Sequence, residues 1–150
     1  MEYFITAEQC RRLAVLPADA RRRLFHAAIA VAMVRLALSL TPFCWVRARV
    51  GVRKPGLRAP GGVLASQWAW AVRVVARRIP RASCLTQALA LQWLLARAGC
   101  SARIHIGVAK HAARGFEAHA WLESGGEILI GGEESLDRFA QILKLPADAA

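Results

Sequence analysis

The sequence predicts an α+β domain in which helices precede a small antiparallel sheet. Apolar residues over 21–40 recur with helical spacing, and a second helical pattern begins at Cys84 behind a serine suited to capping. After Gly99 the apolar pattern changes from helical to alternating. A chain of 150 residues is long enough for one domain with one modest core.

Two helices are expected before residue 42. Thr6 can cap the first helix, and Pro17 opens the second. The apolar run at 21–40 is interrupted by a histidine and an arginine, and Pro42 ends it. Because a membrane span needs about 20 nearly uninterrupted apolar residues, we expect a buried or membrane-leaning helix here rather than a span.

A basic segment rich in glycine and proline, residues 47–62, is expected to connect two parts of the chain. We therefore divide the sequence into an N-terminal helical region with its linker, 1–62, and a core, 63–150, that together form one compact unit. Within the core, 64–79 reads as a helix that a proline stops. A central helix is expected over Cys84–Arg97, ended by a glycine.

The alternating part predicts three strands and a closing helix. The strands are Arg103–Val108, Phe116–Leu122 and Glu127–Ile130, the last two joined by a tight Gly-Gly turn. Leu136–Leu143 is expected to be a short helix. The order of elements favours one central helix followed by an antiparallel meander.

The net charge of +11 comes almost entirely from arginine, which suits contacts with acidic partners. The basic residues are not gathered with aromatic residues into a nucleic-acid motif, so nucleic acid is not the partner we expect. The four cysteines have neither disulfide-scaffold spacing nor a C-x-x-C pair for zinc. No metal is expected, and reduced thiols with no secretory signal at the start favour a cytoplasmic protein.

Cys84 is the candidate nucleophile. It lies in the first turn of a predicted helix, where unpaired amides and the helix dipole stabilise a thiolate and can later stabilise an oxyanion. Arg81 nearby adds positive potential. A buried structural cysteine is the alternative.

His119 is the candidate base. Alternation places His119, Trp121 and Glu123 on one face of a strand, and small alanines flank the histidine, leaving space for a helix end to approach. A cysteine at a helix start facing a histidine on a neighbouring strand forms a dyad in which imidazole takes the thiol proton and later protonates the leaving amine.

A longer pattern joins these residues. The run from Cys84 to Leu91 (Cys-Leu-Thr-Gln-Ala-Leu-Ala-Leu), then Ile106-Gly107-Val108 and Ala118-His119-Ala120-Trp121, resembles the transglutaminase-like maturation proteases of lasso-peptide biosynthesis, the B proteins. The resemblance runs from about Trp70 to Leu143. It implies a papain/transglutaminase-like core, a central helix on a small antiparallel sheet, with Cys84 as nucleophile and His119 as base.

The residue that orients the histidine is where this sequence departs from the family. The family often carries an aspartate at the end of the following strand, and that place falls at Gly131. Glu133 and Glu134 are the nearest carboxylates, and Asp137 is a further candidate. A backbone carbonyl, a water or a simple dyad are the other possibilities.

Other site candidates come with a structural alternative. Gln67 is a candidate oxyanion donor, although it lies on a predicted helix, and Leu85 follows the nucleophile directly. Trp121 is expected to pack beside the site rather than contact substrate. His105 is expected on a solvated strand face, and Cys100 in the core.

The resemblance implies a cysteine peptidase that removes the leader from a lasso-peptide precursor at the leader–core junction, with no cofactor. It implies a separate leader-binding protein as partner and links the product to the ATP-dependent cyclase. The apolar stripe at 24–38, flanked by arginines, is a candidate docking surface. The alternatives are a non-catalytic basic protein that binds nucleic acid or anionic lipid, and a transglutaminase acting on glutamine side chains.

Overall fold

The computed structural model of the chain describes residues 15–50, 62–111, 115–132, 137 and 139–145. Within these ranges four helices precede four strands. The helices are α2 (Ala18–Leu40), α3 (Phe43–Val50), α4 (Gly62–Ala76) and α5 (Cys84–Arg97). The strands are β1 (Arg103–His111), β2 (Gly115–Ser124), β3 (Glu127–Ile130) and β4 (Ala140–Leu145). The expected helix near Thr6 lies outside the described residues.

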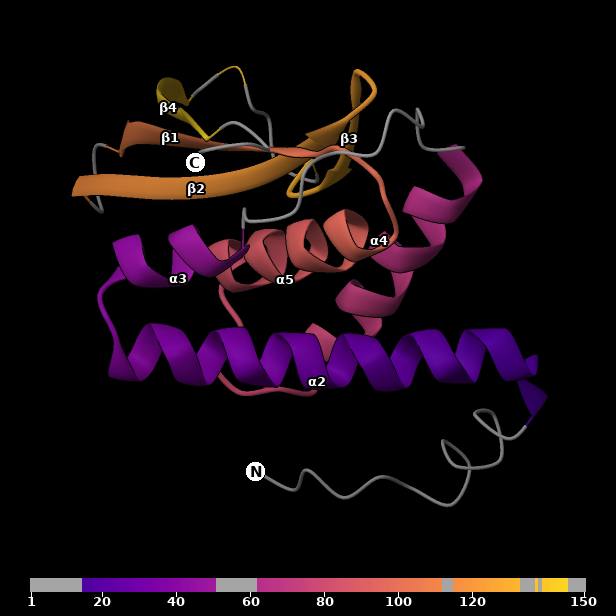
Figure 1. Ribbon diagram of the computed structural model, residues 1–150. Helices are drawn as coiled ribbons and strands as arrows, with labels where there is room; N and C mark the ends of the chain where they lie inside the picture. Colours follow the sequence, from indigo (N-terminus) through magenta and orange to yellow (C-terminus); the bar gives the residue numbers. More distant parts are fainter. Residues whose placement is uncertain (1–14, 51–61, 112–114, 133–136, 138, 146–150) are drawn as a thin grey trace.

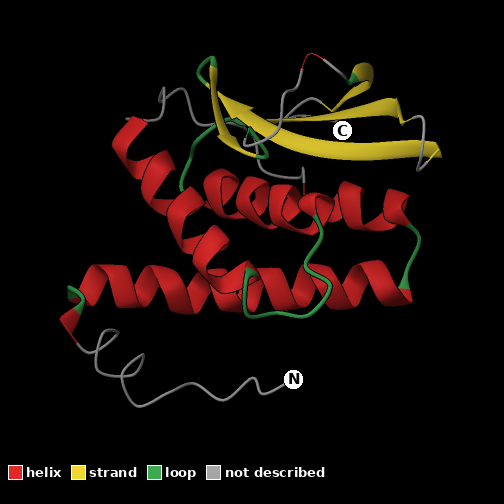
Figure 2. Cartoon of the chain, turned by 180° about the vertical axis from the view of Figure 1, so that it is seen from behind, coloured by secondary structure: helices red, strands yellow, loops and turns green. Residues whose placement is uncertain are grey.

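The elements are stacked in layers, with the sheet on one side, α5 in the middle and α2 on the far side (Figure 1). Helix α4 crosses this stack and contacts α2, α5 and β3. The same layering is visible from behind (Figure 2). The predicted α+β fold, a central helix on a small antiparallel sheet with N-terminal helices, is confirmed.

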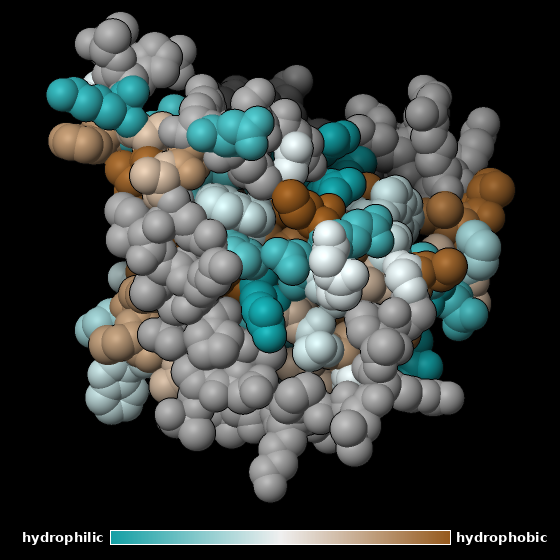
Figure 3. All heavy atoms as spheres, turned by 90° about the horizontal axis from the view of Figure 1, so that it is seen from above, coloured by the Kyte–Doolittle hydropathy of each residue, from teal (hydrophilic) through white to brown (hydrophobic). Residues whose placement is uncertain are grey.

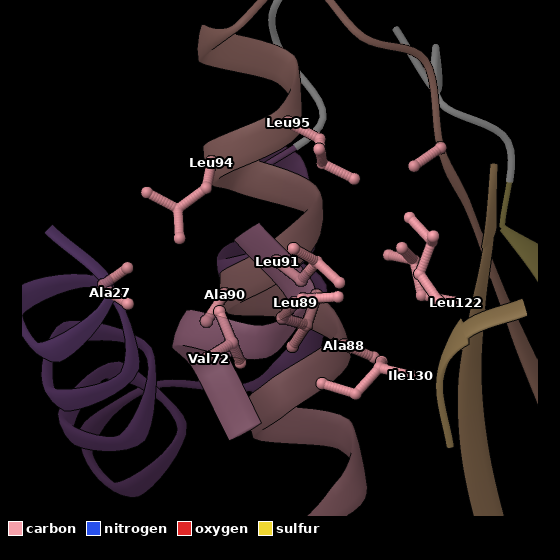
Figure 4. Close-up of a cluster of buried hydrophobic side chains, with 14 of the residues drawn as sticks. Ala27, Val72, Ala88, Leu89, Ala90, Leu91, Leu94, Leu95, Leu122 and Ile130 are labelled. Atoms are coloured by element: carbon pink, nitrogen blue, oxygen red, sulfur yellow. The ribbon is translucent and has the colours of Figure 1, made fainter. Parts of the chain in front are cut away.

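The core lies on both sides of α5. Ala27 of α2 and Val72 of α4 pack on one side, and Leu122 and Ile130 of the sheet pack on the other (Figure 4). Helix α5 is therefore buried on most of its circumference, as its nearly continuous apolar sequence requires. The side chains in this helix that are fully enclosed include Leu89, Leu91 and Leu95.

The sheet is antiparallel throughout, in the order β3-β2-β1-β4. Strands β2 and β3 are joined at Gly125 and Gly126, with φ of 61° and 83°, the left-handed conformation that a tight hairpin turn demands. The sheet was predicted with three strands, and the first two are longer than predicted: β1 continues to His111 and β2 begins at Gly115.

The predicted closing helix Leu136–Leu143 is wrong. Residues Ala140–Leu145 form β4, which pairs with β1 from Ile104 to Val108. Without β4 the backbone groups along this edge of β1 would have no strand to pair with, and unpaired buried backbone groups are costly. Tertiary pairing has overridden the helical pattern, as is common for short segments.

A second correction concerns the segment after Pro42. Phe43–Val50 forms the helix α3, so the beginning of the expected connection 47–62 is helical. Pro42 follows the end of α2. Its carbonyl accepts a hydrogen bond from the Trp45 amide at 3.0 Å, at the start of α3. Val46 is buried, so α3 covers part of the core.

Helix α2 is apolar on its outer side as well as its inner side. Its buried positions include Ala27, Val31 and Val34, which pack toward α4 and α5. Among the described residues, α2 is long and apolar enough to cross a membrane. Core helices of soluble proteins meet the same criterion of length and composition. Five large apolar side chains on its opposite side are exposed: Phe25, Ile29, Met33, Leu36 and Leu40.

Candidate active site

Cys84 is the first residue of α5, as predicted. The Ser83 hydroxyl, in extended backbone, accepts a hydrogen bond from the Thr86 amide at 3.3 Å and so caps the helix. The half-buried thiol therefore lies at the end of α5 that carries the remaining first-turn amides and the positive end of the helix dipole. Such a position suits oxyanion binding.

The loop before Cys84 is held in a tight conformation. Arg81 has a φ of 61°, unusual for a residue with a side chain, and its carbonyl accepts the Ser83 amide at 2.9 Å. A hollow of about 480 Å³ lies beside this loop, lined by Arg77, Pro80 and Ser83 among others. It lies next to the start of α5, and Arg77 and Arg81 make it basic.

His119 lies in the middle of β2, directly opposite Gly107 of β1. Its ring stacks with those of Trp121 and Phe139, with centroid distances of 6.3 and 5.2 Å. Ala120 belongs instead to the core against α5. The predicted alternation is confirmed, and it places His119 on the sheet face opposite α5. Viewed from this side of the molecule, hydrophilic side chains gather near the middle of the face with apolar ones among them (Figure 3).

The imidazole of His119 is held by a backbone group. Its Nε2 lies 2.8 Å from the carbonyl oxygen of Gly131, which follows β3. A carbonyl oxygen only accepts, so Nε2 carries a proton and donates. For the neutral ring, the carbonyl therefore selects the tautomer with the proton on Nε2 and the lone pair on Nδ1.

Gly131 must be a glycine for this geometry. Its φ is 80°, and a Cβ built on it would lie 2.7 Å from the Ala120 oxygen and 2.9 Å from the Trp121 Cβ. An aspartate at this position would not fit without a shift of the backbone.

Gly107 permits the aromatic packing around His119. A Cβ at Gly107 would lie 2.8 Å from the Phe139 Cβ and 3.0 Å from the Trp121 ring. Phe139 and Trp121 are both buried and form a small second core on this face with Ala109. Trp121 packs beside His119, where it was expected. Phe139 was not singled out from the sequence, although a glycine inside a strand pattern is a signal of close approach.

His105 is not on a solvated face, which corrects the prediction. Only 6 % of its surface is exposed, and its ring stacks on Trp121 at 5.5 Å with an interplanar angle of 8°. Its Nε2 lies 3.1 Å from an oxygen of Glu123. Stacking on the cross-strand Trp121 covers a position that was expected to be solvated.

Cys84 and His119 both lie in the described part of the chain, and no hydrogen bond joins the thiol to the imidazole there. The flank of α5 packs on the face that carries Ala120, whereas His119 lies on the other. Catalytic hydrogen bonds are often long in unliganded enzymes and tighten only in the substrate complex. The pairing of these two residues stays a prediction.

The remaining predicted residues are spread around the molecule. Gln67 is exposed on α4, and Leu85 is half-buried against the core next to Cys84. Glu133 and Glu134 lie outside the described residues, and Asp137 is exposed. Cys100 is buried, as predicted, with 5 % of its surface exposed. In the ranges the structure describes, His, Cys, Asp and Glu side chains do not gather in groups of three or more that would suit a metal.

A capped cysteine at a helix start and an oriented histidine on the sheet supply the two groups that a mechanism with a cysteine nucleophile needs. Residues 11–144 match the family model described as the transglutaminase-like superfamily, and the chain belongs to that superfamily. This membership indicates an activity of the cysteine-protease or transglutaminase type. No curated protein and no solved structure gives a significant match.

Proposed function

We propose that this protein is a cysteine peptidase that removes the leader from a lasso-peptide precursor, with Cys84 as nucleophile and His119 as base. The observation that carries the proposal is the hydrogen bond from His119 Nε2 to the Gly131 carbonyl. It leaves Nδ1 as a base in the neutral ring, and the chain belongs to the transglutaminase-like superfamily.

In the proposed reaction, Nδ1 of His119 takes the proton of the Cys84 thiol, and the thiolate attacks the carbonyl at the leader–core junction. The oxyanion is bound by amides in the first turn of α5. The imidazolium then gives its proton to the leaving amine, which leaves an acyl-enzyme. A water molecule, deprotonated by the imidazole, hydrolyses the thioester and releases the acid. The two side chains must approach when substrate binds.

We further propose that the chain works with a separate leader-binding protein in the cytoplasm and passes its product to the ATP-dependent cyclase. The exposed apolar stripe on α2, with Met33 and Leu36 among its members, supports a protein docking surface. A groove of about 480 Å³ beside it is lined by Met33 and by two tryptophans, Trp45 and Trp93. Such a groove suits the apolar side chains of a partner helix.

The test is mass spectrometry of a candidate precursor incubated with this protein and its leader-binding partner. Native protein, Cys84→Ala and His119→Ala are compared, and Cys44→Ala serves as a control because Cys44 is an exposed cysteine on α3. One cut at the leader–core junction is expected with native protein and the control, and none with the other two variants. Cleavage that survives Cys84→Ala would overturn the mechanism.

A primary amine added to the same reaction separates the two activities of the superfamily. A peptidase yields the free acid at the cut, whereas a transglutaminase joins the amine to a glutamine side chain and leaves the backbone intact. The masses of these products differ. An amine adduct on an uncut precursor would contradict the peptidase proposal.

A further inference from the structure

A second hollow, of about 330 Å³, lies between the start of α2 and the end of α5. Arg22, Arg23 and His26 of α2 line it, and Arg97 of α5 lines it from the opposite side. Trp68 of α4 and Trp93 of α5 supply apolar walls. The proposed peptidase chemistry uses none of these residues.

The charge around this hollow is strongly positive. Arg22 and Arg97 are exposed and Arg23 is partly exposed. Among the described residues, none of the three guanidinium groups forms an ion pair, although Asp19 also lines the hollow. Each guanidinium carries a fork of donors that matches a carboxylate or phosphate, so three of them around one hollow favour an anion.

The aromatic walls organise these cations. The guanidinium carbon of Arg97 lies 5.0 Å from the centre of the Trp93 ring, a stacking distance that restricts the side chain before any ligand arrives. The His26 ring lies edge-on to Trp68 at 6.4 Å, and its Nδ1 donates to the Arg22 carbonyl at 2.8 Å. Apolar walls around a group of like charges focus the electrostatic field and strengthen anion binding.

We propose that this hollow binds an acidic segment of a peptide, with the arginines of α2 and α5 contacting successive carboxylates. The cations lie on two helices at opposite sides of the hollow, which suits several carboxylates spaced along a chain better than one compact phosphate group. Trp68 and Trp93 accommodate the apolar side chains that lie between carboxylates in such a peptide. Binding of an acidic peptide in this hollow does not depend on the proposed function. That this peptide is the precursor rests on the proposed function.

The hollow is remote from Cys84. Trp93 and Arg97 lie 9 and 13 residues after Cys84 along α5, which corresponds to roughly 14–20 Å at the rise of an α-helix. An extended peptide needs about six residues to cover that distance. We therefore expect the hollow to hold substrate without taking part in bond cleavage, so its loss raises KM and leaves kcat unchanged.

The binding test uses hexaglutamate as the probe and full-length Cys84→Ala protein, with calorimetry at low salt. Two double variants that each remove two positive charges are compared: Arg22→Gln/Arg97→Gln, and the control Arg21→Gln/Arg103→Gln, whose residues are exposed outside the hollow. The first is expected to weaken binding about tenfold, because charge-assisted contacts at a partly exposed site each contribute modestly. The control is expected to bind as the parent does.

Equal weakening in both double variants would show diffuse surface charge and overturn the proposal, as would unchanged binding in both. Tighter binding of inorganic phosphate than of hexaglutamate, measured by competition, would overturn the peptide proposal in favour of a phosphate-bearing ligand. Thermal unfolding of each variant establishes that it is folded. Because binding is measured without cleavage, a failure of the peptidase proposal in the precursor assay leaves this result intact, and the two outcomes are distinguishable.

Discussion

The Nε2 of His119 donates a hydrogen bond to the carbonyl oxygen of Gly131 across 2.8 Å. A backbone carbonyl is uncharged, so it sets the tautomer and direction of the ring without adding a negative charge beside it. At position 131 the main chain, rather than a side chain, orients the ring. The glycine makes this contact possible through its φ of 80°.

Replacing Gly131 by alanine is expected to destabilise the protein by about 1–3 kcal/mol, because a Cβ would collide with the Ala120 carbonyl and with Trp121. The collision also moves the carbonyl away from His119, so cleavage of the precursor should fall more than stability alone explains. Urea unfolding and the precursor assay measure the two effects. Gly126→Ala is the matched control: its φ is 83°, but a Cβ there meets nothing within 4 Å. Equal loss of activity in both variants would argue against the special role of the Gly131 carbonyl.

Replacing Gly107 by alanine is expected to loosen the aromatic packing on His119. The new Cβ would lie 2.8 Å from that of Phe139, and relieving such overpacking costs about 1–3 kcal/mol. The nitrogen chemical shifts of His119 report its tautomer, and we expect a single Nε2-protonated form in the native protein and a mixture in the variant. Phe139→Leu, which keeps an apolar side chain but removes the ring, should give a similar mixture with a smaller loss of stability. An unchanged tautomer in both variants would show that the Gly131 carbonyl alone orients the ring.

Replacing Ser83 by alanine removes the cap of α5 and the hydrogen bond from the Thr86 amide. The free energy of unfolding is expected to fall by about 1 kcal/mol, as for other caps. Alkylation of Cys84 by iodoacetamide, located by mass spectrometry, should also slow as the first turn frays. Ser83→Asn retains a neutral capping side chain and should restore both properties. If the alkylation rate of Cys84 stays low in Ser83→Asn, the effect comes from loss of the serine hydroxyl itself and not from loss of the cap.

Burial raises the pKa of the Cys100 thiol above its ordinary value. In the unfolded chain the thiol therefore loses its proton at a lower pH than in the folded protein. The contribution of this group to stability is fully present below the ordinary thiol pKa and is lost as the pH rises through the raised value. The free energy of unfolding should thus decline more steeply above about pH 8.5 in native protein than in Cys100→Ala. Parallel curves for the two proteins would show that Cys100 makes no such contribution.

Replacing Leu36 by glutamate places a charge in the middle of the exposed apolar stripe of α2. Leu36 has 60 % of its surface exposed, so the folded state should change in stability by less than about 0.5 kcal/mol. Precursor cleavage that depends on the leader-binding partner should fall strongly, while a short peptide that spans the junction is still cut. Ala32→Glu, at an exposed position beside the stripe, is the control. Full activity with the partner in the Leu36 variant would remove this stripe from the docking proposal.

The helices and the hairpin whose signals are local can be predicted from the sequence. The start of α5 follows from a capping serine, the β2–β3 turn from paired glycines, and the alternation around His119 from a period of two. These patterns predict the fold class and the two candidate catalytic residues. They depend on the conformation of a few neighbouring residues, and so they can be read along the chain.

How distant segments meet depends on contacts across the whole fold. The tertiary structure made a strand of Ala140–Leu145 because the edge of β1 offers backbone partners, and it buried His105 under Trp121. It also brought the Gly131 carbonyl to His119. In each case the controlling contact joins residues that are distant in sequence, so the free energy of packing and hydrogen bonding across the fold overrides the local preference.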